Sequence, residues 1–213
     1  MKKHIVCFGD SNTHGYCADP RDTITGGNRF DETERWTKLL ENQLGENYLV
    51  LEEGLSGRTS VFPDALHESM DGLGVIYSTL MSHEPVDLLV IMLGTNDTKE
   101  RLGVNAACIA IGMDRLVRKA QSVMCWTDGK PNILVVCPPH IRPEMNDVPM
   151  GKGCREKSME LAGYLEPMMK AAGCAFLDAE GVAEFNKLDG MHLTAKGHRQ
   201  LAAKLAEVIP TLL

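Results

Sequence analysis

The chain has 213 residues, of which 44% are hydrophobic, and it carries a formal net charge of −7. This length suits a single domain over residues 1–213, because domains commonly hold roughly 100–200 residues. The acidic balance and the lack of a basic stripe argue against a nucleic-acid partner. No apolar run reaches the roughly 20 residues that cross a bilayer, so a membrane partner is not expected.

Five short apolar runs predict strands at residues 4–8, 48–52, 87–93, 132–137 and 174–177. Most of these runs are continuous, which is typical of strands buried on both faces of a parallel sheet. Apolar residues at helical spacing predict the helices between them, over residues 34–44, 105–124, 153–172 and 194–208. Strands alternating with helices predict a three-layer α/β/α sandwich with a five-stranded parallel sheet.

Some of the predicted helices carry local signals. Gly45 follows the first helix as a C-cap, and Thr194 precedes the last as an N-cap. In the helix over 153–172, Pro167 is expected to kink or shift the axis. The apolar residues that we expect to face the core from this helix are Met159, Leu161, Leu165 and Met168.

Two stretches, residues 17–33 and 138–152, are predicted to be long loops because they are rich in turn-forming residues. Long loops in a compact domain often bind ligands. We therefore expect these two loops to decide which substrate the protein accepts.

The seven cysteines include no C-x-x-C pair of the kind that binds zinc or carries out redox chemistry. Their odd number and spacing indicate a reducing compartment without a disulfide framework. The first apolar run is short and is broken by Gly9-Asp10, unlike a secretory signal peptide. A cytoplasmic location is therefore expected.

Each predicted strand is followed by small or polar residues. Ligands of open α/β sheets bind beyond the carboxyl ends of the strands, so these residues should share one rim. The segments are Gly9-Asp10-Ser11-Asn12, Gly54-Leu55-Ser56-Gly57-Arg58-Thr59, Gly94-Thr95-Asn96-Asp97, Pro138-Pro139-His140 and Leu188-Asp189-Gly190-Met191-His192.

Three residues of this rim have the chemistry that acyl transfer needs. The hydroxyl of Ser11 is a weak nucleophile until a base removes its proton, and His192 is a suitable base near neutral pH. Asp189 lies three residues before His192, a spacing at which a carboxylate can orient the imidazole within a turn. The oxyanion could be held by the backbone N–H of Ser11, the backbone N–H of Gly57 and the side-chain amide of Asn96.

These blocks resemble, in order, the four sequence blocks of the SGNH hydrolases, also called the GDSL esterase family. They are Gly9-Asp10-Ser11, then Gly57 within Leu-Ser-Gly-Arg-Thr, then Gly94-Thr95-Asn96-Asp97, then Asp189-x-x-His192. Three neighbouring segments further resemble sequences of the arylesterase/acyltransferase branch. They are Arg35-Trp36-Thr37, Glu52-Glu53-Gly54-Leu55-Ser56 and Ile91-Met92-Leu93-Gly94.

The resemblance implies a flavodoxin-like sandwich with Ser11 as nucleophile, His192 as base and Asp189 as its orienter. It also implies Ser11, Gly57 and Asn96 as oxyanion donors, in a serine esterase that hydrolyses small or short-acyl esters without a metal or other cofactor. Some members of the branch form oligomers and pass the acyl group to alcohols, so a homo-oligomer and acyl transfer remain open. Carbohydrate O-deacetylase, lysophospholipase and thioesterase activities are alternatives within the same fold.

Other classes of function find less support in the sequence. A Mg-dependent aspartyl phosphatase would use Asp10, but it needs a second acid where this chain has Asn12. A flavodoxin-like binding module is an alternative without catalysis, although neither G-x-G-x-x-G nor a P-loop motif follows a strand. An α/β-hydrolase would use Ser56, but the glycine after it, Gly57, comes one residue too early for G-x-S-x-G.

The other cationic residues of the predicted rim and the remaining histidines are expected to have structural rather than catalytic roles. Arg58 and Lys99 are expected to be solvated surface charges, with the steering of an anionic substrate as the alternative. His14 and His140 lie on the predicted rim, where contact with a substrate is an open alternative. The other histidines, expected at the surface or in packing, are His4, His67, His83 and His198.

Overall fold

The computed structural model describes residues 2–213. Its centre is a five-stranded parallel sheet in the order β2-β1-β3-β4-β5. Every predicted strand is present, and each end lies within two residues of the predicted one. The strands are β1 (Lys3–Gly9), β2 (Tyr48–Gly54), β3 (Leu88–Met92), β4 (Ile133–Cys137) and β5 (Ala175–Asp178).

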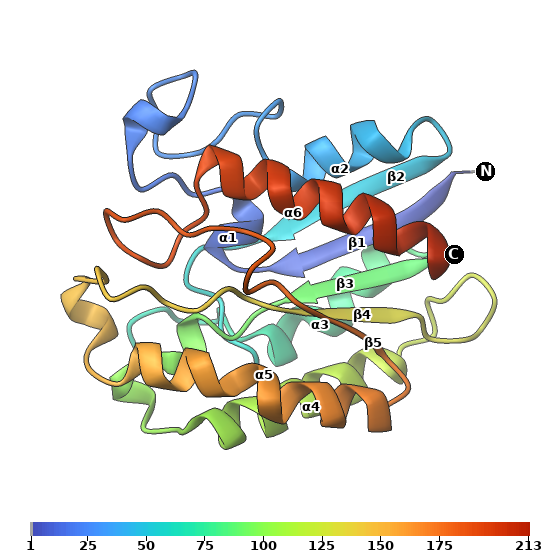
Figure 1. Cartoon of the computed structure of the whole chain (residues 1–213). Coiled ribbons are helices and arrows are strands. Elements are labelled where there is room, and N and C mark those ends of the chain that lie inside the picture. Colours follow the sequence, from blue (N-terminus) through green and yellow to red (C-terminus); the bar gives the residue numbers. More distant parts are fainter. Residues whose placement is uncertain (1) are drawn as a thin grey trace.

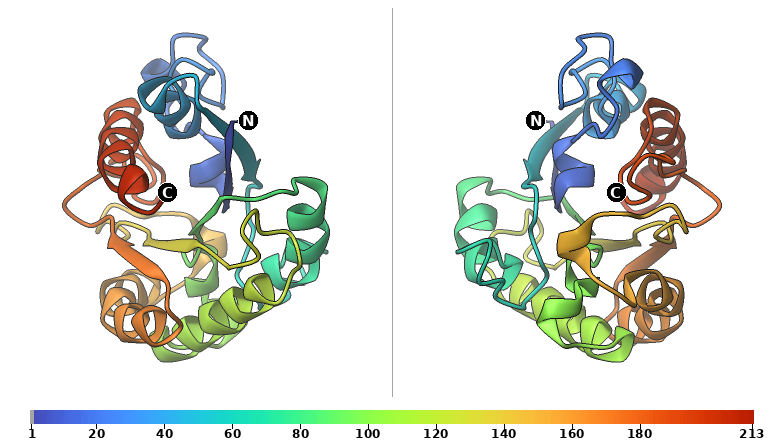
Figure 2. Two further views of the ribbon diagram at one scale, coloured as in Figure 1. Left: turned by 90° about the vertical axis from the view of Figure 1, so that its right-hand side faces the viewer. Right: turned by 90° about the vertical axis from the view of Figure 1, so that its left-hand side faces the viewer.

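The helices cover both faces of this sheet and complete the predicted three-layer sandwich (Figures 1 and 2). One face carries α2 (Trp36–Leu44) and α6 (Ala195–Val208), and the other carries α3 (Gly72–Ser82), α4 (Ala106–Gln121) and α5 (Cys154–Ala171). A short helix, α1 (Ser11–His14), follows β1 directly. Within residues 2–213, no helix has both the length and the apolar character needed to cross a membrane.

Two apolar cores, one on each face, explain why the strands have continuous apolar sequences. Along β1, Val6 and Phe8 point into the core beneath α3, α4 and α5, whereas Ile5 and Cys7 point into the core beneath α2 and α6. Successive side chains of a strand alternate between faces, so a sheet covered on both sides needs apolar residues at every position. Burial on both faces therefore produces the pattern read from the sequence.

The helix α3 was missed by the sequence analysis, and one prediction for α5 was wrong. The two glycines of α3, Gly72 and Gly74, weaken its helical pattern, although Ile76 and Leu80 are buried at helical spacing. In α5, Met159 is 45% exposed and does not face the core. The buried residues, which repeat every three or four positions, are Cys154, Ser158, Leu161, Leu165 and Met169. Met168 is partly buried against the core, and α5 continues through Pro167 to Ala171.

The strand order places the end of β1 at the point where the direction of winding reverses. The chain runs from β1 to β2 on one side and then crosses to β3 on the other side of β1. In open α/β sheets, the crevice at such a switch point is the usual ligand site. All strands point the same way, so the residues that follow β1, β2 and β3 meet at one edge (Figure 1).

The short helix α1 is seated directly on the end of β2. A Cβ atom added at Gly54 would lie 2.1 Å from the backbone nitrogen of His14 and 2.7 Å from its Cα. Only a residue without a side chain permits such a close approach of two backbone segments. Gly54 therefore fixes how α1, and with it Ser11, sits on the sheet.

We expect the substitution Gly54→Ala to destabilise the fold by about 3 kcal/mol, because the added methyl group meets backbone that cannot move aside. The matched control is Gly163→Ala in α5, where an added Cβ finds no atom within 4 Å. Alanine in a helix interior should stabilise that variant by about 0.5–1 kcal/mol. Urea unfolding of both variants measures the difference, and a Gly54→Ala protein as stable as the parent would contradict this account of α1.

Candidate active site

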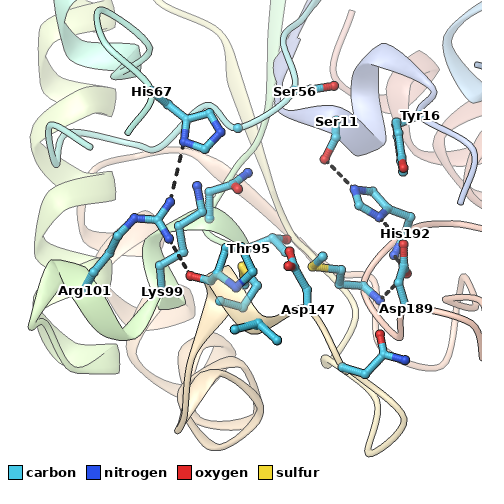
Figure 3. Close-up of a pocket in the computed structure, with 17 residues that line it drawn as sticks. Ser11, Tyr16, Ser56, His67, Thr95, Lys99, Arg101, Asp147, Asp189 and His192 are labelled. Atoms are coloured by element: carbon cyan, nitrogen blue, oxygen red, sulfur yellow. Dashed lines mark hydrogen bonds and ion pairs between the residues drawn. The ribbon is translucent and has the colours of Figure 1, made fainter. Parts of the chain in front are cut away.

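A pocket of about 650 Å³ opens at the carboxyl edge of the sheet (Figure 3). It is lined by all five residues predicted to form the site: Ser11, Gly57, Asn96, Asp189 and His192. They come from four separate segments of the chain. The pocket therefore joins the segments that follow β1, β2 and β3 to the turn that precedes α6.

Ser11, His192 and Asp189 form one line of hydrogen-bonding groups (Figure 3). The Oγ of Ser11 lies 2.9 Å from the Nε2 of His192, and the Nδ1 of His192 lies 2.7 Å from the Oδ2 of Asp189. Both His192 and Ser11 are buried. When Nδ1 carries a proton held by the carboxylate, Nε2 is free to accept the proton of the hydroxyl.

The carboxylate of Asp189 is fixed by its own turn. Its Oδ1 accepts hydrogen bonds from the side-chain amide of Asn186 (2.9 Å) and from the backbone N–H groups of Met191 (3.1 Å) and His192 (3.2 Å). Burial works to raise the pKa of Asp189, but the hydrogen bond and charge of His192 oppose it, and the pKa is lowered overall. The group therefore stays ionised and can stabilise an imidazolium beside it.

The amide of Asn12 attaches this turn to α1. Its Nδ2 donates to the carbonyl of Met191 (3.1 Å), and its Oδ1 accepts from the backbone N–H of Leu193 (3.0 Å). These two bonds lie on either side of His192. Asn12 is only 2% exposed, and its own carbonyl accepts the indole N–H of Trp36 at 3.1 Å. No role was predicted for Asn12 from the sequence, although a polar amide in the first turn after a strand end is a recognisable signal.

The ring of Tyr16 covers one side of His192. The two ring centroids are 4.6 Å apart, with an angle of 53° between the planes. Tyr16 follows α1 directly, so the same segment that carries Ser11 also limits where the imidazole can turn. No role was predicted for Tyr16 from the sequence.

Two candidate oxyanion donors, Gly57 and Asn96, also line the pocket. Gly57 adopts a φ of +89°, a conformation that favours glycine. Gly54, the other glycine of the segment that includes the end of β2, is pressed against α1 and does not line the pocket. The Nδ2 of Asn96 lies 3.4 Å from the Oδ2 of Asp10, which orients the amide. The geometry therefore favours Gly57 over Gly54 as a donor.

Two buried carboxyl groups, Asp10 and Asp97, hold the loops around this pocket. Asp10 caps α1 by accepting the backbone N–H of Asn12 at 2.9 Å. Asp97 accepts the backbone N–H of Ser60 at 2.9 Å and also its hydroxyl, which ties the segment after β3 to the segment after β2. Burial raises the pKa of both groups, that of Asp97 to about 6, against the hydrogen bonds that each accepts.

A family model for the GDSL-like lipase/acylhydrolase family matches residues 7–200 of the chain. The chain belongs to this family. It is a carboxylic ester hydrolase with the α/β/α fold of the SGNH hydrolases. No curated protein matches the chain.

Solved structures of esterases resemble this GDSL-like hydrolase over its whole length. An aryl esterase of M. smegmatis is 36% identical with a TM-score of 0.89, and the match covers 99% of this chain and 100% of that one. A carbohydrate acetylesterase from Sinorhizobium meliloti is 32% identical with a TM-score of 0.90, and all of both chains is covered. A lipase/acylhydrolase from Enterococcus faecalis, at 19% identity and a TM-score of 0.71, shares the fold.

Several side chains of the hydrolase lie where the sequence analysis did not expect them. Arg58 is not a solvated charge, because it is 5% exposed and donates to the carbonyls of Gly9 and Glu53. Lys99 is also buried and lines the pocket. His67 is partly exposed, in line with the expectation that it lies at the surface, and it lines the pocket too. Cations are buried where a carbonyl or a carboxylate pairs with them, and a single sequence does not reveal such partners.

Only some of the residues that were expected to contact a substrate line the pocket. The loop over 138–152 supplies residues 146–150 to the pocket, but no residue of 17–33 lines it. Neither His14 nor His140 is among the lining residues, and the backbone N–H of His140 instead donates to Glu180. Of the two predicted loops, only the later one borders the site.

The alternative functions, an aspartyl phosphatase and an α/β-hydrolase, fit this geometry poorly. Asp10, the nucleophile of a phosphatase, is buried beneath α1 and does not line the pocket. Ser56 does line the pocket, but within residues 2–213 its hydroxyl has no hydrogen bond to a histidine. Among the described residues, no group of three or more His, Cys, Asp or Glu side chains is arranged to hold a metal.

We expect Asn12→Ala to destabilise the hydrolase by about 2–4 kcal/mol, since it leaves a buried carbonyl and a buried N–H unpaired. The freed turn should also move His192 away from Ser11 and lower the rate of ester hydrolysis. Asn105→Ala, which removes the N-cap of α4, is the control and should cost about 1 kcal/mol without changing the rate. Thermal unfolding and p-nitrophenyl acetate hydrolysis test both, and equal behaviour of the two variants would contradict the role of Asn12.

Proposed function

We propose that this hydrolase is a serine esterase that cleaves short-acyl carboxylic esters through an acyl-enzyme. Ser11 is the nucleophile, His192 is the general base and Asp189 orients the imidazole. The observation that carries the proposal is the 2.9 Å contact between the Oγ of Ser11 and the Nε2 of His192. The family match over residues 7–200 supports a single hydrolase domain over residues 1–213.

The first half of the reaction forms the acyl-enzyme. The Nε2 of His192 takes the proton of Ser11 as Oγ attacks the ester carbonyl, and the carboxylate of Asp189 stabilises the resulting imidazolium. The oxyanion accepts hydrogen bonds from the N–H groups of Ser11 and Gly57 and from the amide of Asn96. Each such donor typically contributes on the order of 10²–10³ in rate.

The second half releases the acid. The imidazolium of His192 gives its proton to the departing alkoxide, and the alcohol leaves. A water molecule then loses a proton to Nε2 and attacks the acyl carbonyl, which returns Ser11 to its free form. An alcohol in place of this water would yield a new ester, so acyl transfer needs no further catalytic group.

Most of the residues that line the pocket are of polar or charged types, which favours a small acyl group and a hydroxylated alcohol. Of the seventeen described residues that line it, only Val148, Pro149, Met150 and Met191 are clearly apolar, too few to cover a long acyl chain. This observation favours carbohydrate O-deacetylation over lysophospholipase or thioesterase activity. The similarity to a carbohydrate acetylesterase supports this second candidate.

We expect Ser11→Ala to lower p-nitrophenyl acetate hydrolysis by several orders of magnitude, because the nucleophile acts as a unit with its base. Ser56→Ala is the matched control, since Ser56 lies in the same pocket and should matter little. A serine-directed fluorophosphonate should inactivate the parent protein, whereas EDTA should not. A Ser11→Ala protein that keeps most of its activity would end the proposal.

The choice between the substrate classes is tested with two series of esters. We expect kcat/KM for p-nitrophenyl esters to fall as the acyl chain lengthens beyond a few carbons, because few clearly apolar side chains line the pocket. Acetylated sugars should release acetate when incubated with the enzyme. Faster hydrolysis of long-chain esters than of acetyl esters would exclude a preference for small acyl groups.

A further inference from the structure

Two cations, Lys99 and Arg101, line the side of the pocket that lies away from His192 (Figure 3). Both follow β3, in the segment that begins with Asn96. We refer to Lys99 and Arg101 as the cationic wall. The chain as a whole is acidic, with a net charge of −7, so the wall is not part of a generally basic surface.

One carboxylate, Asp64, holds both cations in place behind the pocket. Its Oδ2 lies 2.9 Å from the Nζ of Lys99 and 2.6 Å from Arg101, whose Nε also donates to Oδ1 at 2.9 Å. Asp64 is buried and does not itself line the pocket. Since two cations share one carboxylate, one positive charge remains for the pocket.

The ammonium group of Lys99 retains hydrogen-bonding capacity that the described residues do not use. It has three N–H donors, and within residues 2–213 only Asp64 accepts from it. The side chain is 5% exposed, so little solvent reaches these donors except through the pocket. A buried ammonium gains most from a partner that is itself charged.

The wall is close to where the ester carbonyl would lie. The imidazole of His67 lies between the cationic wall and Gly57. On the side of the wall, its Nδ1 lies 3.3 Å from the Oδ2 of Asp64 and 3.5 Å from Arg101. On its other side, a Cβ added at Gly57 would lie only 2.9 Å from the Cδ2 of His67. One ring therefore separates the cationic wall from the candidate oxyanion donor Gly57.

Two carboxylates also line the pocket, and they set where an anion can bind. Asp189 is paired with His192, so its charge is turned toward the imidazole. Asp147 comes from the loop over 138–152 and has no cationic partner within residues 2–213. An anionic group is repelled at the Asp147 side and attracted at the Lys99 side, so the pocket is polarised.

We propose that the cationic wall binds a carboxylate or similar anionic group of the substrate, so that the preferred ester carries a negative charge close to the bond that is cleaved. This inference rests on the proposed function. It narrows the substrate class from small polar esters to anionic ones, such as half-esters of dicarboxylic acids or acetyl esters of acidic alcohols.

Paired substrates that differ in one charge test the proposal. Monoethyl and diethyl succinate place the charge on the acyl side, and 4-acetoxybenzoate and its methyl ester place it on the alcohol side. We expect the parent enzyme to favour the anionic member of at least one pair in kcat/KM. In Arg101→Gln and Lys99→Gln, the anionic-to-neutral ratio for that pair should fall roughly tenfold, as expected for the loss of a charged hydrogen bond.

Matched variants separate charge from structure. Arg101→Lys keeps the charge and should keep most of the preference, whereas Lys204→Gln removes an equal charge from the surface of α6 and should leave the ratio unchanged. Asp147→Asn should raise the ratio, because it removes a competing negative charge. Added salt should lower kcat/KM for the anionic ester more than for the neutral one.

The proposal is overturned if the parent enzyme favours the neutral member of both pairs, or if Arg101→Gln and Lys99→Gln leave the ratio unchanged. Binding of succinate and of 4-hydroxybenzoate to Ser11→Ala, measured by calorimetry, does not depend on ester cleavage. Anion binding that is lost in the Ser11→Ala/Arg101→Gln double variant supports the wall even if Ser11 is not the nucleophile. Conversely, a loss of hydrolysis in Ser11→Ala with no anion binding supports the esterase and rejects the wall.

Discussion

Two hydrogen bonds from one buried amide hold the pocket of this hydrolase together. The side chain of Asn12 bonds to the backbone on both sides of His192, and the same residue follows Ser11 in α1. The position of the imidazole relative to the hydroxyl is therefore set by backbone and a short side chain rather than by a flexible loop. Rigid support of this kind is what sites that depend on distances near 3 Å require.

Much of the fold and of the site follows from local sequence. The apolar runs predicted all five strands, most clearly β3 and β4, where burial on both faces leaves no polar position in the pattern. The parallel sheet then requires the segments after β1, β2 and β3 to meet at one edge, which is why Ser11, Gly57 and Asn96 could be grouped without coordinates. The spacing of Asp189 and His192 was readable because a turn brings residues three apart within hydrogen-bonding distance.

What escaped the sequence analysis depends on partners that lie far away in the chain. Lys99 looks like a surface residue until Asp64, 35 positions earlier, is seen beside it. The burial of Arg58 is possible because its guanidinium donates a hydrogen bond to the carbonyl of Gly9, 49 positions away. Met159 was misplaced for a different reason, since Met159 and Leu161 are two apart and cannot share one face of a helix. The first two errors needed tertiary structure, whereas the third was avoidable.

The distance along the chain between Ser11 and His192, 181 positions, has a consequence for biosynthesis. A protein emerges from the ribosome with its N-terminus first, so the strand and helix that carry the serine appear long before the turn that carries the imidazole. A nascent or stalled chain that ends before this turn holds Ser11 without the imidazole of His192. Pairing of the two groups therefore has to wait until this turn has been synthesised, and α6, which follows the turn, packs against α2.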